Sequence, residues 1–321
     1  MGITIYDVAA GAQVSPATVS RVLAGGASVA AETEARVREV IERLGYRPDR
    51  VAQSLRRQRS GTIGLAIPAE QHHAGQAIIG RLSQRLAEAD LSLMVATTDR
   101  RPAGPELDRL VAQRVDALIV VRDRIAQELP SPEGVPVLAL DSGRSDLPVD
   151  TIRIDHAAGI RQAVRFMVNE GASRLVYIGE GTESVIGADQ LAGYAEATAE
   201  RDVANAALRL GPRTAQFART EFERLRAGDQ PPDAYICGSD LVAAAINASL
   251  PVETTPDRPY IVGYGAHPWV AMLRPVLSTV RLPIDELVDE AVRVLQQRLD
   301  GLRTEPVDIA LPPSLILGET S

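Results

Sequence analysis

Residues 1–46 carry their apolar side chains at helical spacing, three or four residues apart, in three short runs. Ser15 and Pro16 precede the second run as an N-cap and a first helical residue. The third run covers about residues 31–44 and ends at Gly45. The pattern therefore predicts three helices, with the first two joined by a tight turn. This is a helix-turn-helix arrangement.

After residue 60 the pattern changes to short, nearly continuous apolar runs that alternate with helical segments. The runs cover residues 62–68, 91–98, 117–121, 135–141, 151–155, 175–180, 234–238 and 260–265. Such runs indicate parallel strands covered on both faces by helices. There are too many for one compact sheet, so we expect an α/β domain of two lobes. Ligands bind such lobes at the carboxyl ends of the strands.

The second predicted helix has an outer face with few large side chains. Its inner positions are Val19, Val22 and Leu23, whereas its outer face carries Ala17, Ser20, Arg21 and Ala24. A slim helix face fits the major groove of DNA, where arginine binds guanine and apolar groups contact the thymine methyl. We expect Arg21 to contact guanine, Pro16 and Ala17 to contact methyl groups, and Thr18 and Ser20 to bind phosphates or bases. A helix packed against another protein is the alternative.

Charge is distributed unevenly along the chain. The net charge is −8, which by itself argues against a nucleic-acid binder. Residues 1–60 nevertheless carry +3, and residues 43–59 contain six arginines and one aspartate. A short, arginine-rich segment can become ordered on DNA and insert an apolar side chain into the minor groove. This asymmetry favours a nucleic-acid-binding end attached to a larger acidic body.

Several other classes of protein are disfavoured. No apolar run is long enough to span a membrane, and the N-terminus lacks the features of a signal peptide, so we expect a cytoplasmic protein. The single cysteine, Cys237, allows no internal disulfide. No P-loop, nucleophile elbow or zinc-protease motif is present, so we expect neither an enzyme nor a cofactor. His72 and His73 are adjacent and point apart, which disfavours a metal site.

The chain resembles the LacI/GalR (lactose-repressor) family of bacterial transcriptional regulators. The resemblance is most specific in "TIYDVAAGAQVSPATVSRVLAG" and "RVREVIERLGYRPDRVAQSLRRQRSGTIGLAIP", and it continues more loosely to the end. It implies a DNA-binding headpiece at residues 1–46, a hinge helix or linker at 47–60, and an effector-binding and dimerisation domain at 61–321. That domain is similar to periplasmic binding proteins. We place its first lobe at about 61–151 and 282–303 and its second at about 152–281 and 304–321.

The resemblance also implies roles for individual residues. Pro16, Ala17 and Arg21 match base-contacting positions. The positions that match contacts to the DNA backbone are Tyr6, Ser15, Thr18, Ser20, Ser28 and Thr33. The positions that match the hinge segment are Val51, Ala52, Leu55 and Arg56, with Leu55 at the minor-groove wedge. Two headpiece positions depart from the family: Gln13 stands where Gly is usual, and Ala30 replaces a Ser N-cap. Loss of a cap costs about 1 kcal/mol.

The expected effector pocket departs further from the family. Its usual acidic, aromatic, Arg, Asn and Asp anchors suit a sugar, and their places are taken by Ala69, Ala74-Gly75, Gln190, Ser239 and Gly265. One explanation is a chemically different ligand. Its candidate contacts are Gln71, His72, His73, Gln190, Ser239, Tyr264 and His267. The other explanation is that no small-molecule effector exists. We interpret Asp240 as a helix N-cap.

One headpiece contacts only half of a DNA site, so we expect a homodimer on a pseudo-palindromic operator. Apolar stripes on residues 78–86 and 284–299 either form that dimer or cover their own sheet. No leucine heptad follows, so we do not expect a tetramer. The function expected is a repressor modulated by an effector other than a typical sugar. The alternatives are an activator, an effector-independent regulator with a vestigial pocket, or a small-molecule-binding two-lobed protein.

Overall fold

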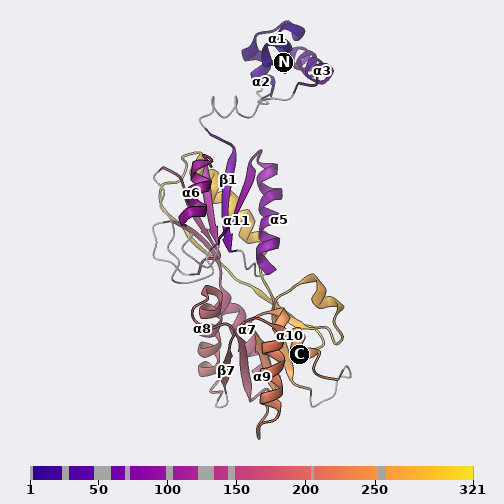
Figure 1. The fold of residues 1–321 in the computed structure, drawn as a ribbon, viewed down its shortest axis with the longest axis vertical. Helices are drawn as coiled ribbons and strands as arrows, with labels where there is room; N and C mark the ends of the chain where they lie inside the picture. The colour runs from indigo at the N-terminus through magenta and orange to yellow at the C-terminus, as the bar shows by residue number, and fades with distance from the viewer. Residues whose placement is uncertain are drawn as a thin grey trace. The chain divides into compact units, whose positions relative to one another are not determined.

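The computed structural model describes residues 3–23, 29–46, 59–68, 73–98, 104–121, 134–143, 149–203, 206–251 and 258–320. The chain divides into two compact units, Met1–Ser60 and Gly61–Ser321 (Figure 1). Within the predicted hinge at 47–60, residues 47–58 lie outside the described residues.

The first unit consists of three helices around a small core. They are α1 (Ile5–Ala12), α2 (Pro16–Leu23) and α3 (Ala31–Leu44). The core side chains are short and mostly β-branched: Val8, Ala9, Ala12, Val19, Val22, Val37 and Val40. Ser15 caps α2, because its hydroxyl accepts a hydrogen bond from the Thr18 backbone N–H at 3.1 Å. The three helices predicted from the apolar spacing are confirmed.

Both departures in the headpiece have visible structural consequences. Gln13 ends α1 in the left-handed region, with φ 54° and ψ 46°. The tight turn that follows is closed by a hydrogen bond from the Val14 N–H to the Ala9 carbonyl at 3.0 Å. Ala30 precedes α3 with an extended backbone and provides no side-chain hydrogen bond to the helix start.

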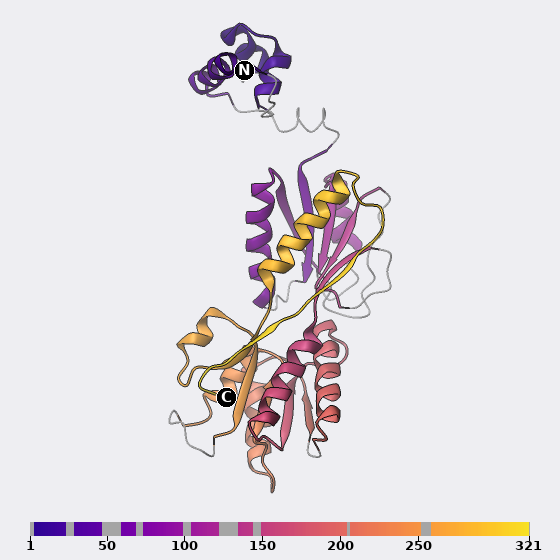
Figure 2. The same ribbon diagram turned by 180° about the vertical axis from the view of Figure 1, so that it is seen from behind.

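The first lobe of the second unit is built on a six-stranded parallel sheet in the order β11-β5-β4-β3-β1-β2. The strands are β1 (Thr62–Pro68), β2 (Ser92–Thr98), β3 (Ala117–Val121), β4 (Val137–Leu140), β5 (Asp150–Ile154) and β11 (Asp308–Leu311). Helices α5 (His73–Glu88) and α11 (Ile284–Leu299) cover one face, and α6 (Gly104–Ala112) packs on the other (Figures 1 and 2).

The second lobe repeats this plan with the strand order β12-β10-β9-β8-β6-β7. The strands are β6 (Leu175–Gly179), β7 (Ala207–Leu210), β8 (Ala234–Cys237), β9 (Tyr260–Gly265), β10 (Ser278–Arg281) and the antiparallel β12 (Ser314–Ile316). Helices α7 (His156–Asn169) and α8 (Val185–Glu200) cover one face. The other face is covered by α9 (Ala215–Arg226) and α10 (Asp240–Asn247), and a short 3-10 helix, η1 (Pro268–Met272), follows β9.

The chain passes between the lobes after β5, after β10 and after β11. This corrects part of the expected lobe boundaries. We expected residues 304–321 in the second lobe, but β11 pairs with β5 at the edge of the first sheet. Strand β5 also remains in the first sheet up to Ile154, beyond the expected boundary at 151.

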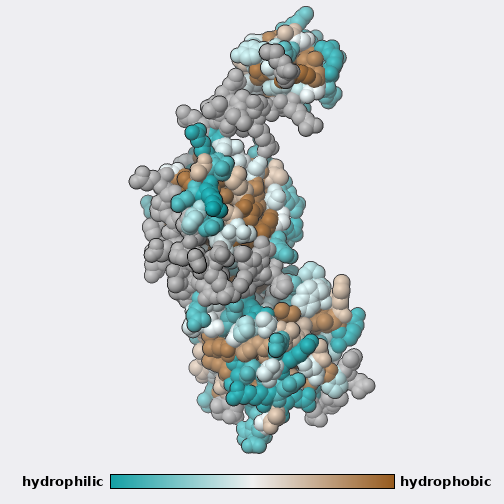
Figure 3. All heavy atoms as spheres, in the orientation of Figure 1, coloured by the Kyte–Doolittle hydropathy of each residue, from teal (hydrophilic) through white to brown (hydrophobic). Residues whose placement is uncertain are grey.

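The two apolar stripes that were candidates for a dimer contact cover their own sheet. Ile78, Leu82 and Leu86 of α5 are buried in the same core as Leu287 and Leu295 of α11. Exposed ion pairs link the two helices, Arg81 with Asp285 and Arg85 with Asp289. None of the described helices is long and apolar enough to cross a membrane. The face drawn in Figure 3 mixes hydrophilic and hydrophobic residues.

Candidate functional site

The outer face of α2 is accessible, as the sequence predicted. Ala17 and Arg21 are exposed, and Pro16, Thr18 and Ser20 are partly buried. Val19 and Val22 lie behind them in the core and hold the helix in place. Short side chains therefore surround a single long cation, so the backbone of α2 can approach a groove closely.

Arg21 differs from Arg36 and Arg38 of the headpiece. It has no hydrogen bond or ion pair with any residue that the structure describes. Arg36 donates to the Ala12 carbonyl at 2.9 Å, and Arg38 forms an ion pair with Glu34. The Arg21 guanidinium, with its five N–H donors, is therefore available to an external acceptor.

The other predicted DNA contacts that the structure describes are at least partly accessible. Tyr6 on α1 is 67% exposed, Ser15 is exposed and Thr33 on α3 is partly buried. The remaining predicted contacts lie outside the described residues: Ser28, Val51, Ala52, Leu55 and Arg56.

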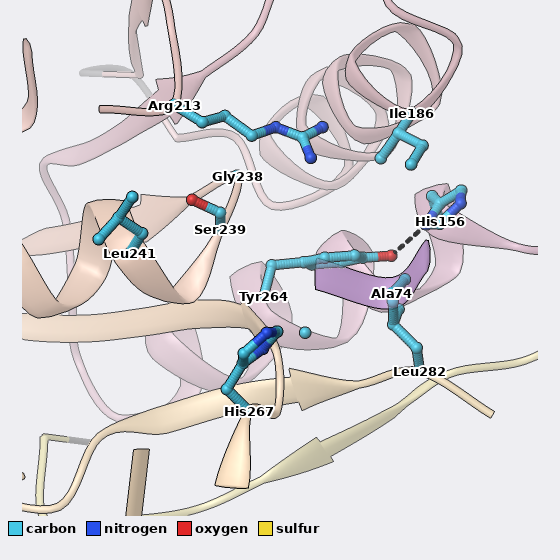
Figure 4. Close-up of a pocket in the computed structure, with 11 residues that line it drawn as sticks. Ala74, His156, Ile186, Arg213, Gly238, Ser239, Leu241, Tyr264, His267 and Leu282 are labelled. Atoms are coloured by element: carbon cyan, nitrogen blue, oxygen red, sulfur yellow. Dashed lines mark hydrogen bonds between the residues drawn. The ribbon is translucent and has the colours of Figure 1, made fainter. Parts of the chain in front are cut away.

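A second candidate site is a cavity of about 160 Å³ in the second unit (Figure 4). Its polar side chains lie at or just after the carboxyl ends of strands, or at the start of a helix. They are His156, Arg213, Ser239, Tyr264 and His267. Its apolar side chains are Ala74, Ile186, Leu241 and Leu282. Ala74 belongs to α5 of the first lobe, so both lobes contribute to the wall.

A buried hydrogen-bonded chain runs along one side of the cavity. The His156 Nε2 lies 3.0 Å from an Asp141 carboxylate oxygen, and its Nδ1 lies 2.6 Å from the Tyr264 hydroxyl. Burial raises the pKa of Tyr264 well above its ordinary value, so the hydroxyl keeps its proton. Asp141 follows β4 and also accepts the Ile154 backbone N–H at 3.2 Å.

The other polar side chains of the cavity have carboxylates behind them. An Arg213 Nη lies 2.8 Å from a Glu180 carboxylate oxygen. His267 has its Nδ1 3.5 Å from Asp240, which also accepts the His267 backbone N–H at 2.8 Å. Figure 4 shows the Tyr264 ring between Arg213 on one side and His267 on the other. The wall therefore presents one cationic donor, Arg213, while the carboxylates of Glu180 and Asp240 are absent from the described lining of the cavity.

The structure places the predicted effector residues differently from one another. Ser239, Tyr264 and His267 line the cavity. Gln190 is fully buried behind the wall, where its amide accepts from the Tyr177 hydroxyl at 2.9 Å and donates to the Gly238 carbonyl. Gln71 and His72 lie outside the described residues, and only the backbone of His73 is described, as the first residue of α5.

Sequence reasoning missed His156 and Arg213. Both satisfy the rule that ligand contacts follow the carboxyl ends of parallel strands. His156 comes two residues after β5, and Arg213 comes three residues after β7, a strand that the apolar pattern did not reveal. Ser239, not Asp240, caps α10, because the Ser239 hydroxyl accepts the Val242 N–H at 3.3 Å.

No group of three or more metal-ligating side chains occurs among the residues that the structure describes.

The two units together define a class of protein: a helix-turn-helix DNA-binding unit linked to a two-lobed α/β ligand-binding unit. Residues 4–49 match the model of bacterial regulatory proteins of the lacI family, and residues 164–321 match that of a periplasmic binding protein-like domain. The chain therefore carries a LacI-family DNA-binding domain and a periplasmic binding protein-like domain, and transcriptional regulators of the LacI family are DNA-binding proteins and not enzymes.

Curated relatives and solved structures are similar to this protein over nearly the whole length of the chain. Catabolite control protein A of Staphylococcus aureus (strain MRSA252) is 27% identical, and that of Staphylococcus epidermidis is 28% identical, each over 97% of both chains. The Lac repressor dimer bound to operator and the anti-inducer ONPF is 26% identical, with a TM-score of 0.82 over 100% of this chain and 99% of that one. A complex of the transcriptional regulator CelR with cellobiose is 26% identical, with a TM-score of 0.70 over 99% and 100%.

Proposed function

We propose that this protein is a cytoplasmic repressor that binds a pseudo-palindromic operator as a homodimer. The observation that carries the proposal is the exposed, small-residue face of α2 with Arg21 at its centre and no internal partner described for it. In the proposed complex Pro16, Ala17 and Arg21 contact bases, and the hydroxyl residues around them contact the DNA backbone. The similarity to an operator-bound Lac repressor dimer supports both the DNA partner and the dimer.

The cavity of the second unit supports regulation by a small molecule. It lies where three chain crossings join the lobes, and residues from both lobes line it. A ligand that binds one arrangement of the lobes more tightly than another shifts the population of the two arrangements. Its effect on DNA affinity is limited by that difference in affinity.

Selection of random duplexes by the purified full chain tests the DNA-binding function. We expect a two-fold symmetric sequence to be enriched, with half-sites separated by one helical turn. The Arg21→Ala variant should lose about 1–3 kcal/mol of binding free energy on that sequence and tolerate other bases at one position of each half-site.

Arg38→Ala is the matched control, because it removes an equal charge from an exposed residue of α3 that already pairs with Glu34. Arg38→Ala should lower the affinity for all DNA sequences by about the same factor, and this factor should be smaller than the loss that Arg21→Ala causes on the selected sequence. No enriched sequence, or an equal loss for Arg21→Ala on selected and random DNA, would contradict the proposal. Transcription from a promoter that carries the selected site then separates a repressor from an activator.

A further inference from the structure

The geometry points to a small carboxylate with an apolar, ring-sized body as the ligand of the cavity, anchored by Arg213. This inference rests on the proposed function, since it names the chemical class of the effector. It differs from the sugar class, whose many hydroxyl groups donate hydrogen bonds as well as accept them and are bound best by strong acceptors such as carboxylate and carboxamide groups. Among the described residues that line the cavity, none carries a carboxylate or carboxamide.

The hydrogen bonds already made by the wall residues determine which of their polar groups remain available to a ligand. The Ser239 hydroxyl oxygen already accepts the Val242 N–H, so its own proton is left to donate. The Tyr264 hydroxyl is engaged with His156. The Gln190 amide, the nearby carboxamide, bonds to Tyr177 and Gly238 behind the wall. The Arg213 guanidinium and the Ser239 hydroxyl therefore remain as donors for a ligand, and they suit a ligand whose polar end accepts.

Arg213 is the strongest of these donors. Its side chain is 14% exposed, and its buried Nε has no hydrogen-bond acceptor in the part of the chain that the structure describes. The Nη2 of Arg213 lies 2.8 Å from a Glu180 carboxylate oxygen, but the geometry of this ion pair is not that of a hydrogen bond. A buried N–H without an acceptor costs free energy, which a carboxylate ligand would recover through a charge-assisted hydrogen bond.

The rest of the cavity defines the body of the ligand. Ile186, Leu241 and Leu282 line it together with the face of Tyr264 (Figure 4). The cavity volume is about 160 Å³, and an apolar cavity of about 150 Å³ is known to hold a benzene-sized molecule. Apolar walls and this size suit an aromatic or alicyclic monocarboxylate better than a strongly hydrated phosphate or a disaccharide.

Calorimetric titration of the full-length protein tests the inference. The probes are benzoate, phenylacetate and cyclohexanecarboxylate, with benzamide as the neutral analogue of the first and cellobiose as the sugar. At least one carboxylate should bind, and its affinity should exceed that of its amide by about tenfold or more, as expected for loss of a charge-assisted hydrogen bond. Binding by none of the acids, or equal binding of benzoate and benzamide, would overturn the inference.

Three variants assign the binding to Arg213. Arg213→Gln should weaken carboxylate binding by about tenfold or more. Arg209→Gln is the matched control, because Arg209 pairs with Glu221 and does not line the cavity. Its carboxylate affinity should remain that of the unmodified protein. Glu180→Gln frees the guanidinium from its internal partner and should tighten carboxylate binding. This variant tests the role of Arg213 even if Arg213→Gln fails to fold. Unchanged affinity in both Arg213→Gln and Glu180→Gln would refute the role of Arg213.

The same protein preparation separates this inference from the proposed function. Enrichment of a symmetric DNA sequence without any carboxylate binding would overturn the ligand class and leave the DNA-binding function standing. Carboxylate binding without an enriched DNA sequence would do the reverse. Release or tightening of the selected duplex by the bound carboxylate would support both.

Discussion

Replacing Gln13 with glycine is expected to stabilise the first unit by roughly 0.5–1 kcal/mol. Gln13 holds φ at 54°, a left-handed conformation that costs a side-chain-bearing residue roughly 1–2 kcal/mol. Glycine avoids this cost, but the greater conformational entropy of glycine in the unfolded chain offsets roughly 0.5–1 kcal/mol of the gain. The Gln13 side chain is exposed and makes no hydrogen bond to any residue described, so little else is lost.

Amide hydrogen exchange of the full-length protein measures this change within the three helices. The most protected amides of α1 and α3 should exchange about two- to fivefold more slowly in Gln13→Gly. Two controls isolate the backbone conformation. Gln13→Ala should change protection little, because alanine also resists the left-handed region. Glu39→Gly, at an exposed position inside α3, should lower protection by about 1 kcal/mol. Equal stabilisation by alanine and glycine at position 13 would refute the reasoning.

The other predictions concern three further positions. Ala30→Ser should restore the missing cap of α3 and raise headpiece protection by about 1 kcal/mol, whereas Ala35→Ser inside the helix should not. Hydrogen bonds from the Thr4 N–H and hydroxyl lower the pKa of Asp7. The ionised Asp7 therefore stabilises the headpiece above its ordinary pKa of 3.8, and this contribution is lost as the pH falls through the lower pKa of the folded state. Asp7→Asn should remove this part of the pH dependence of amide exchange in the headpiece. Arg298→Met leaves the buried Asp150 carboxylate without its two-point partner and should cost about 3–5 kcal/mol in thermal unfolding, whereas Arg293→Met, at an exposed pair with Glu290, should change it by less than about 1 kcal/mol.

Sequence patterns predicted those elements whose stability comes from local signals or from complete burial. The headpiece helices begin at recognisable caps, and α3 ends at Gly45 with φ 63°, as a glycine after a helix predicts. The central strands are apolar on both faces because helices cover both, and their apolar runs were sufficient to find them. For these elements the local pattern and the tertiary structure favour the same conformation.

Four strands, β7, β10, β11 and β12, escaped prediction for physical reasons. Burial alternates along β7, but its two leucines, Leu208 and Leu210, occupy the exposed positions at 46% and 47%, so the strand lacks the usual pattern of large apolar residues facing the core. Strands β10, β11 and β12 are three or four residues long. Hydrogen bonds to a neighbouring strand, distant in sequence, make these segments strands, and no local pattern records that partner.

The candidate ligand site was predicted only in part because side-chain direction depends on tertiary packing. Ser239 was named from the resemblance, as the residue at a pocket position of the family, and Tyr264 was named as a candidate contact beside another such position, Gly265. Arg213 follows β7 and was missed together with that strand. Gln190 occupies a position that contacts ligand in the resembling family, yet here its amide turns inward to Tyr177 and Gly238. A position in an alignment fixes the backbone location and leaves the side-chain partner open.

The hydrogen-bonded chain from Asp141 through His156 to Tyr264 gives the cavity a direct physical link to the lobe junction. Asp141 follows β4 of the first sheet, whereas Tyr264 belongs to β9 of the second and forms part of the cavity wall. Gly143, two residues after Asp141, approaches Val185 of α8 so closely that a Cβ at this position would lie 2.6 Å from the valine side chain. Among the described residues the two lobes therefore meet through close packing and through a buried polar chain that reaches the cavity wall. Packed contacts of this kind hold discrete arrangements and do not deform continuously. A ligand that changes the position of the Tyr264 ring acts on the same bonds that join β4 to α7, and its differential affinity for the two arrangements sets how far the lobes respond.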